Sequence, residues 1–153
     1  MTSKVLTFYL NEELYGVDIN IVKELNRNID YTKVPDSNDH IKGLFNMRGQ
    51  IVTVFDLNKI LGFEEKTYTK NTCITLKMTS KIINTVGFLI DKTGDVLEID
   101  EEITESPPAN IKGIEDKFIK LIAKIEENIL IVLDPETIFN PEHFLLDQNN
   151  KIN

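Results

Sequence analysis

The chain has 153 residues, of which 41% are hydrophobic and 27% charged, and its formal net charge is −8. This length and composition are typical of a packed protein and argue against intrinsic disorder. The negative charge opposes binding to nucleic acid, which relies on clustered lysine and arginine. The N-terminus lacks a signal-peptide pattern, and no segment approaches the roughly 18 apolar residues of a membrane span, so we expect a cytoplasmic protein.

Short apolar runs rich in Val, Ile, Phe and Thr are separated by polar turns along most of the chain. Strands spaced about 8–12 residues apart are typical of an all-β barrel or sandwich. Polar residues at 11–13 and 79–82 are suited to hairpin turns between neighbouring strands. The predicted strands are 5–10, 14–19, 51–57, 73–78, 83–91, 96–99, 118–126 and 128–134.

Three short helices are predicted, at residues 19–25, 57–61 and 135–139. The third has the clearest start, because Asp134 is placed to cap it and Pro135 occupies its first position. The sequence therefore predicts an all-β fold with short helices.

An internal repeat divides the chain into two halves of about 70 residues. "QIVTVFDLNKILG" at 50–62 matches "NILIVLDPETIFN" at 128–140, and "IKGL" at 41–44 recurs as "IKGI" at 111–114. We interpret the halves as two similar small β-barrels. In this alignment the second half carries an added strand, "FIKLIAKIE", and "FNMRG" of the first half has no counterpart.

Signatures of catalysis, metal binding and nucleotide binding are absent from the sequence. The two histidines, His40 and His143, lie far apart in polar segments, and the single cysteine, Cys73, forms neither a disulfide nor a metal cluster. The seven glycines form no phosphate-binding pattern. Paired carboxylates lie between the apolar runs, where solvated loops are expected. We therefore expect no enzyme activity, no metal and no cofactor.

Arg48 is an unusual choice of cation, since the chain uses arginine only twice but lysine fifteen times. A solvated turn residue is one interpretation. The other is recognition, because a guanidinium offers a planar fork of donors for a carboxylate or for backbone carbonyls. Gly49 beside it permits a bend in the backbone or the close approach of a partner.

Several segments, taken in order, resemble the CheW family of chemotaxis coupling proteins across nearly the whole chain. The most specific pattern is G-x-x-N-x-R-G-x-x-x-x-x-x-D-L, which begins at Gly43. The segments are "FYLNEELYGVDINIVKEL", "VP", "IKGLFNMRGQIVTVFDLNKILG", "VGFLIDKTGDVLEI" and "NILIVLD".

The resemblance implies two five-stranded β-barrels packed around a shared hydrophobic core. It implies one CheW-like domain at residues 1–140, between whose halves strands can be exchanged, and we expect a partly helical or disordered tail at 141–153. It also implies a non-enzymatic adaptor that joins the cytoplasmic tip of chemoreceptors to the regulatory domain of a CheA-type histidine kinase. Any association with a membrane would then occur only through the receptors.

Matched to the family motif, a set of residues is expected to contact the receptor or the kinase. For the apolar members, a place in the core is an equally good interpretation. The set is Val22, Glu24, Gly43, Arg48, Gly49, Cys73, Ile74 and Val96.

Two positions depart from the family pattern. Thr53 stands where a proline is usual, which should be harmless in a strand, and the residues near Thr93 make one groove edge more polar than usual. Two other functions stay open: an adaptor of a related pathway such as pilus-based motility, and a small-ligand-binding or enzymatic β-barrel. The last would need convergent polar groups in a pocket, and the sequence shows none.

Overall fold

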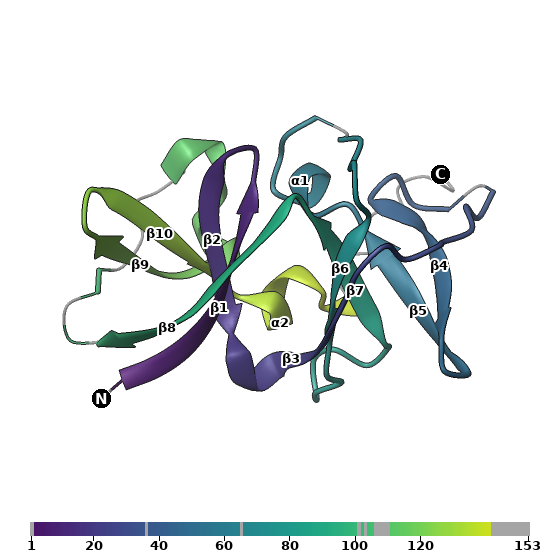
Figure 1. The fold of residues 1–153 in the computed structure, drawn as a ribbon, viewed down its shortest axis with the longest axis horizontal. Helices are drawn as coiled ribbons and strands as arrows, with labels where there is room; N and C mark the ends of the chain where they lie inside the picture. Colours follow the sequence, from purple (N-terminus) through teal and green to yellow (C-terminus); the bar gives the residue numbers. More distant parts are fainter. Residues whose placement is uncertain are drawn as a thin grey trace.

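The structure of the protein, a computed structural model, describes residues 2–35, 37–64, 66–100, 102, 104–105 and 111–141. Except for Pro141, the predicted tail at 141–153 lies outside these residues, as does His143. Strands dominate the fold (Figure 1). They are β1 (Thr2–Leu10), β2 (Glu13–Asp18), β3 (Val22–Asn26), β4 (Ile41–Met47), β5 (Gln50–Phe55), β6 (Thr72–Leu76), β7 (Val86–Ile90), β8 (Lys92–Asp100), β9 (Ile119–Ile125) and β10 (Asn128–Leu133).

The helices are all short. They are α1 (Leu57–Ile60), α2 (Pro135–Ile138) and the 3-10 turns η1 (Ile19–Ile21), η3 (Ile111–Gly113) and η4 (Asp116–Phe118). Within the described ranges, no helix has the length and apolar character needed to cross a membrane.

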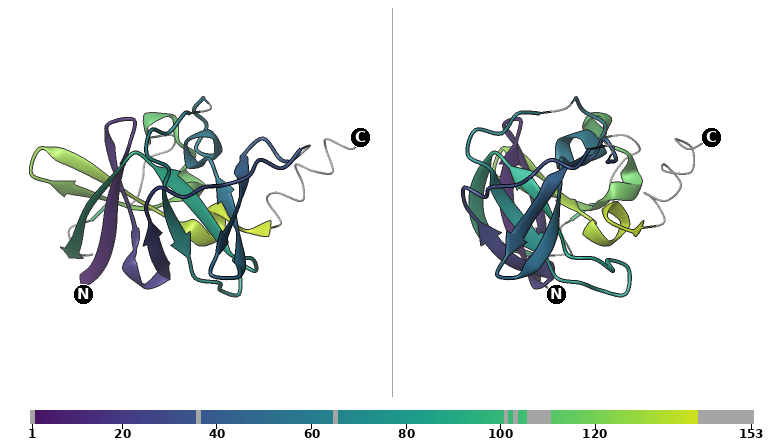
Figure 2. Two further views of the ribbon diagram at one scale, coloured as in Figure 1. Left: turned by 45° about the vertical axis from the view of Figure 1, so that its right-hand side comes forward. Right: turned by 90° about the vertical axis from the view of Figure 1, so that its right-hand side faces the viewer.

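The strands form two five-stranded sheets that lie side by side along the long axis of the molecule (Figures 1 and 2). The first has the order β8-β1-β2-β10-β9 and the second the order β3-β6-β7-β5-β4. Strand β3 follows β2 in the chain but pairs with β6, and β8 follows β7 but pairs with β1. Each half of the chain therefore contributes to both sheets: β1 and β2 join β8, β9 and β10 in the first sheet, and β6 and β7 join β3, β4 and β5 in the second.

Neither sheet is closed by strand pairing among the described residues, so the expectation of closed barrels is not confirmed. Both sheets come close to closure. Glu105, which follows β8, exchanges two backbone hydrogen bonds of 3.0 Å with Ile122 of the opposite edge strand, β9. Thr32, which follows β3, exchanges two backbone hydrogen bonds of 2.8 and 2.9 Å with Leu44 of the opposite edge strand, β4. The supported description is a mostly β protein of two five-stranded sheets with two short α-helices.

The repeat of 50–62 and 128–140 is present as two copies of a strand, a capping aspartate and a helix. The Asp56 side chain accepts a hydrogen bond from the backbone N–H of Lys59, and Asp134 accepts one from that of Thr137. These short carboxylates satisfy amides at the helix starts that lack intrahelical partners. The predicted helices at 57–61 and 135–139 are confirmed.

The repeat extends upstream differently from our sequence alignment. Residues 111–113, "IKG", form a 3-10 turn, whereas "IKG" at 41–43 opens strand β4. The true counterpart of β4 is β9: Ile41 pairs with Phe55, and 78 positions later Ile119 pairs with Leu133. "FIKLIAKIE" is therefore not an added strand, and the Arg48–Gly49 turn has a counterpart in Glu126–Glu127.

The helix predicted at 19–25 was wrong beyond its first turn. Only Ile19–Ile21 is helical, and Val22–Asn26 forms strand β3. The apolar spacing fits one face of a helix, but pairing with β6 overrides this local preference. Strand β4 was missed because Lys42, Gly43 and Asn46 interrupt its apolar pattern.

Aromatic side chains connect the two sheets through the larger of two hydrophobic clusters, while the smaller one lies within the first sheet around Leu130. Phe8 of β1 lies 5.4 Å from Phe88 of β7, measured between ring centroids. Phe139, after α2, lies 5.9 Å from Phe88 and 5.2 Å from Phe55 of β5. The turns and edge strands that could bind a partner are therefore supported by a core that both halves share.

Candidate partner-binding site

The Arg48–Gly49 turn joins β4 to β5 and lies at the lower edge of Figure 1. Met47 pairs with Gln50, so the loop has two residues, and both have positive φ, 52° at Arg48 and 88° at Gly49. This backbone is the one that matches the twist of a tight hairpin, and glycine adopts it most easily. The Gly49 N–H donates to the Asn46 side-chain oxygen at 2.7 Å. The predicted bend at Gly49 is confirmed.

Glu24 of β3 forms an ion pair with Arg48 across the gap between the edges of the second sheet. Its hydrogen bond to Arg48 lowers the pKa of the Glu24 carboxyl, and the pKa of the guanidinium is raised in return. Beside this pair, the Lys23 ammonium donates to the Gln50 side chain at 2.7 Å. The structure thus brings together two predicted site residues that are 24 positions apart in sequence.

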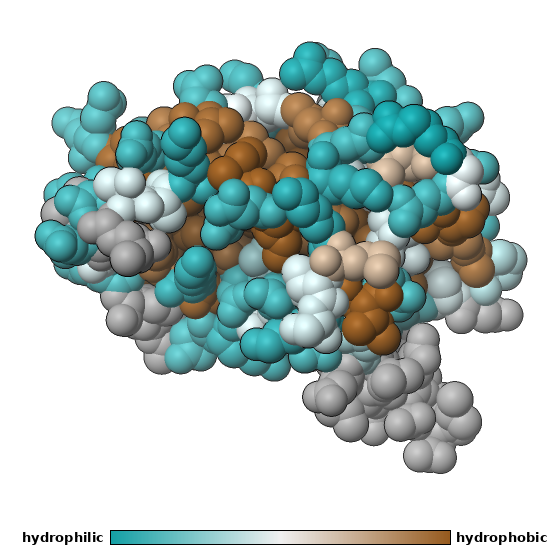
Figure 3. Space-filling model, turned by 90° about the horizontal axis from the view of Figure 1, so that it is seen from below, coloured by the Kyte–Doolittle hydropathy of each residue, from teal (hydrophilic) through white to brown (hydrophobic). Residues whose placement is uncertain are grey.

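Exposed apolar side chains flank this ion pair. Gln50 also donates to the Thr85 hydroxyl at 2.8 Å, which ties the hairpin to the β6–β7 loop. Ile51 of the hairpin and Met78 and Ile83 of the loop are more than half exposed. From below, apolar side chains form a broken band among hydrophilic ones (Figure 3). We call the following residues the corner surface: Lys23, Glu24, Arg48, Gln50, Ile51, Met78 and Ile83.

Sequence reasoning missed Ile51, Met78 and Ile83. Alternation along β5 could have identified Ile51, because Val52 and Val54 are fully buried and the residue before them must face outward. Met78 and Ile83 lie around a loop, where no periodic pattern signals exposure.

Gly43 and Val22 are both closely packed against neighbouring parts of the structure. A Cβ atom on Gly43 would lie 2.4 Å from the backbone oxygen of Thr32, so glycine is required where this segment crosses β4. Val22 is half-buried, pairs with Leu76 and packs against the core. Both residues shape the region around Glu24 and Arg48.

The remaining predicted residues lie elsewhere. Cys73 and Ile74 are core residues of β6, 0% and 1% exposed, so their side chains cannot touch a partner on the surface, and we leave them out of the proposed contact. Burial raises the pKa of the Cys73 thiol to about 12, so it stays protonated. Val96 is 51% exposed but lies on β8, in the other sheet, opposite Leu6.

The corner surface is suited to recognition. It presents a guanidinium, a carboxylate, an ammonium and apolar side chains, a mixture typical of protein interfaces. No group of three or more potential metal-binding side chains occurs in the part of the chain that the structure describes.

Comparison with known proteins identifies the family. A CheW-like domain matches residues 4–143. The chain belongs to the CheW-like family. Its fold is similar to the crystal structure of the scaffolding protein TtCheW from Thermoanaerobacter tengcongensis, with a TM-score of 0.79 and 32% sequence identity, covering 92% of this chain and 89% of that one.

Curated relatives agree with this family assignment. The chemotaxis protein CheW of Treponema pallidum is 32% identical over 90% of this chain and 82% of its own length. The chemotaxis protein CheW of Bacillus subtilis is 30% identical over 91% of this chain and 88% of its own length. These relatives confirm the prediction of a CheW-like chemotaxis coupling adaptor that is not an enzyme.

Proposed function

We propose that the corner surface binds the cytoplasmic tip of chemoreceptors, and that one of the two sheets contacts the regulatory domain of a CheA-type histidine kinase. The Arg48–Glu24 ion pair carries this proposal. The Arg48 side chain is 71% exposed, and within the described ranges its only ion-pair partner is Glu24. Because a guanidinium has five N–H donors, the pair aims it outward with donors left for a partner's carboxylates or carbonyls.

In this proposal the adaptor works in the cytoplasm and reaches the membrane only through the receptors it binds. Residues 1–140 form the working unit, in which each sheet acts as a curled, barrel-like subdomain. Gly43 and Val22 support the hairpin and β3, and Val96 provides an apolar contact on the first sheet. The overall charge of −8 fits a protein partner better than a nucleic acid.

Substitution Arg48→Glu tests the proposal. We expect the circular dichroism spectrum and melting temperature to change little, because exposed ion pairs contribute little to stability. Binding should be lost, because the variant places a second carboxylate beside Glu24 and removes the guanidinium. The measurement is co-sedimentation of the purified adaptor with a receptor cytoplasmic fragment and the kinase.

Two controls separate a direct contact from a structural role. Lys70→Glu makes the same change of charge at an exposed position outside both sheets and should bind normally. The exchange Glu24→Arg with Arg48→Glu restores an ion pair in reverse order. If the exchange recovers co-sedimentation, Arg48 acts only through its ion pair with Glu24 and not by contacting the partner directly. If Arg48→Glu alone unfolds the protein or binds fully, the proposal is wrong.

A further inference from the structure

In the first half of the chain, the loop after α1 fills a site beside the capping carboxylate of Asp56. The Tyr68 hydroxyl donates to Asp56 at 2.8 Å, and the Lys66 backbone N–H donates to the same carboxylate at 3.2 Å. The Lys66 ammonium lies 3.3 Å from Asp91, while that of Lys42 donates to the Lys66 carbonyl at 2.8 Å. Tyr68 is 7% exposed and has the ammonium groups of Lys42 and Lys66 near its ring.

The second half repeats this site. Lys120 and Asp134 stand 78 positions after Lys42 and Asp56, on strands paired in the same register. Asp18, at the end of β2, takes the place of Asp91, which follows β7. Both halves therefore have a lysine on the edge strand, a capping aspartate and a second aspartate.

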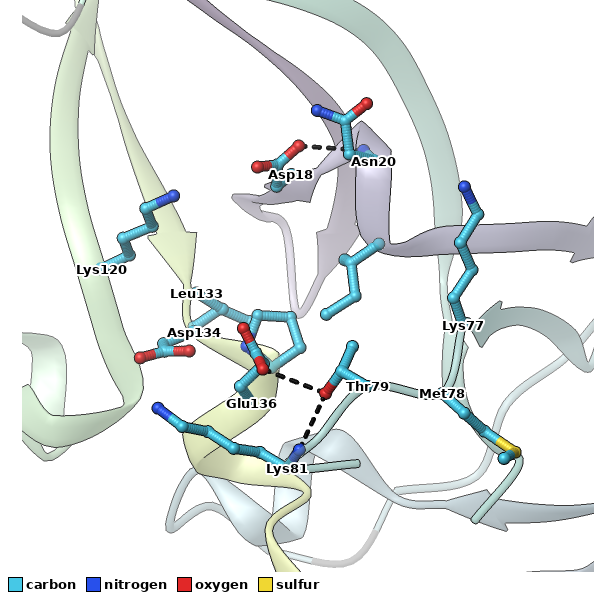
Figure 4. A pocket seen from close by; sticks show the side chains of 12 residues that line it. Asp18, Asn20, Lys77, Met78, Thr79, Lys81, Lys120, Leu133, Asp134 and Glu136 are labelled. Carbon is cyan, nitrogen blue, oxygen red and sulfur yellow. Dashed lines mark hydrogen bonds between the residues drawn. The ribbon is translucent and has the colours of Figure 1, made fainter. Parts of the chain in front are cut away.

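In the second half the Thr137 hydroxyl donates to Asp134 at 2.9 Å, and no described tyrosine or lysine hydrogen-bonds to this carboxylate. A pocket of about 460 Å³ is present instead (Figure 4). Its charged lining comprises three acidic residues, Asp18, Asp134 and Glu136, and three lysines, Lys77, Lys81 and Lys120, and Leu133 and Pro135 are part of its apolar lining. Thr79 donates to Glu136 at 3.0 Å across it. The Lys120 ammonium has no ion pair among the residues that the structure describes.

The groups that fill the site beside Asp56 indicate which groups the pocket beside Asp134 would bind. An incoming lysine would pair with Asp18 as Lys66 pairs with Asp91, and a phenol would donate toward Asp134 while its ring lies near Lys120. The chain does not supply these groups at the same offset, where it has Phe144 and Leu146. A second copy could not supply its own loop, because Tyr68 is buried in that copy.

We propose that this pocket binds a loop of a partner protein that presents a lysine and a tyrosine two residues apart, in the way that Lys66 and Tyr68 fill the first half. The site lies between the end of β2, the β6–β7 loop and the start of α2. It does not include the Arg48–Glu24 pair, and it adjoins the corner surface at Met78, so it adds a second contact beside the first.

A peptide tests this inference on the full chain. The probe is the capped heptapeptide EKTYTKN, the sequence of residues 65–71. NMR titration should shift the amide signals of Thr79, Lys120 and Glu136. Replacing its tyrosine by phenylalanine should weaken binding about tenfold, since a hydrogen bond to a charged group is lost. Asp18→Asn in the protein should weaken binding of this peptide by a similar factor. For a peptide whose first lysine is replaced by alanine, the same substitution should weaken binding far less.

Three outcomes would overturn the inference. One is the absence of shifts at the pocket at peptide concentrations up to about 5 mM, the range expected for a single short segment. Another is equal binding of a scrambled peptide of the same composition, which would indicate attraction by charge alone. The third is a set of shifts centred on Asp56 and Lys42, which would mean that the peptide displaces the protein's own loop.

Discussion

Glu24 and Arg48 come from opposite edges of one curled sheet, and their ion pair fixes the direction of the only guanidinium on the corner surface. The sequence singled out Arg48 because lysine is the usual cation of this chain. It also carried Glu24 over from the family motif. It could not show that the two meet, because the contact depends on β3 leaving the sheet of β1 and β2 and pairing with β6.

The protonation of Glu24 should report this contact. Since Arg48 lowers the Glu24 pKa in the folded protein, the contact favours folding above the ordinary glutamate pKa of 4.5 and is lost as pH falls through the lowered value. We expect the side-chain carboxyl of Glu24 to titrate below 4.5 in a carbon-detected NMR experiment. Arg48→Gln should return the midpoint toward 4.5. Identical midpoints in the two proteins would show that the pair does not form in solution.

At the scale of elements, the local sequence pattern was sufficient to predict strands that are apolar throughout. It was insufficient where pairing between strands determines the secondary structure. All eight predicted strands are present, and β6 and β7 are buried along their whole length. Strand β3 was predicted as helix, and β4 was missed, because both edge strands are partly polar. The repeat was misaligned upstream for a related reason. The segment "IKGI" at 111–114 is similar to β4 in sequence, whereas β9 is equivalent to β4 in its strand pairing.

Two glycine substitutions around the same hairpin should differ in their effects. Gly43→Ala places a methyl group against the Thr32 carbonyl, and overpacking of this kind costs about 1–3 kcal/mol. Gly49→Ala meets no atom within 4 Å, so only its positive φ opposes it, at about 1 kcal/mol. Urea denaturation of both variants measures the difference. Equal stabilities would mean that the segment at Thr32 does not press on β4.

Over the whole molecule, both halves contribute strands to both sheets and share one main core, and the first sheet adds a smaller hydrophobic cluster of its own around Leu130. The family resemblance led us to expect a shared core, and the aromatic contacts between Phe8, Phe88 and Phe139 provide it. The open pocket beside Asp134 could not be predicted, because it depends on the loop after α1 filling one site while its counterpart stays open. Because only one of the two repeated sites is filled, the second half has an open pocket that the first half lacks.

A shared core predicts that both sheets lose protection together. Phe88→Ala removes the ring between Phe8 and Phe139, and we expect a loss of about 3–5 kcal/mol in the free energy of unfolding. Hydrogen exchange should accelerate by the same factor for amides of β1 in the first sheet and β6 in the second, because a single cooperative opening exposes both. Phe88→Leu, which leaves a smaller cavity, provides the same comparison if the alanine variant does not fold. Ile129→Ala, at a position that is 41% exposed, should change exchange in both sheets much less. Selective loss of protection in the second sheet would instead mean that the sheets unfold separately and that the aromatic contacts do not couple them.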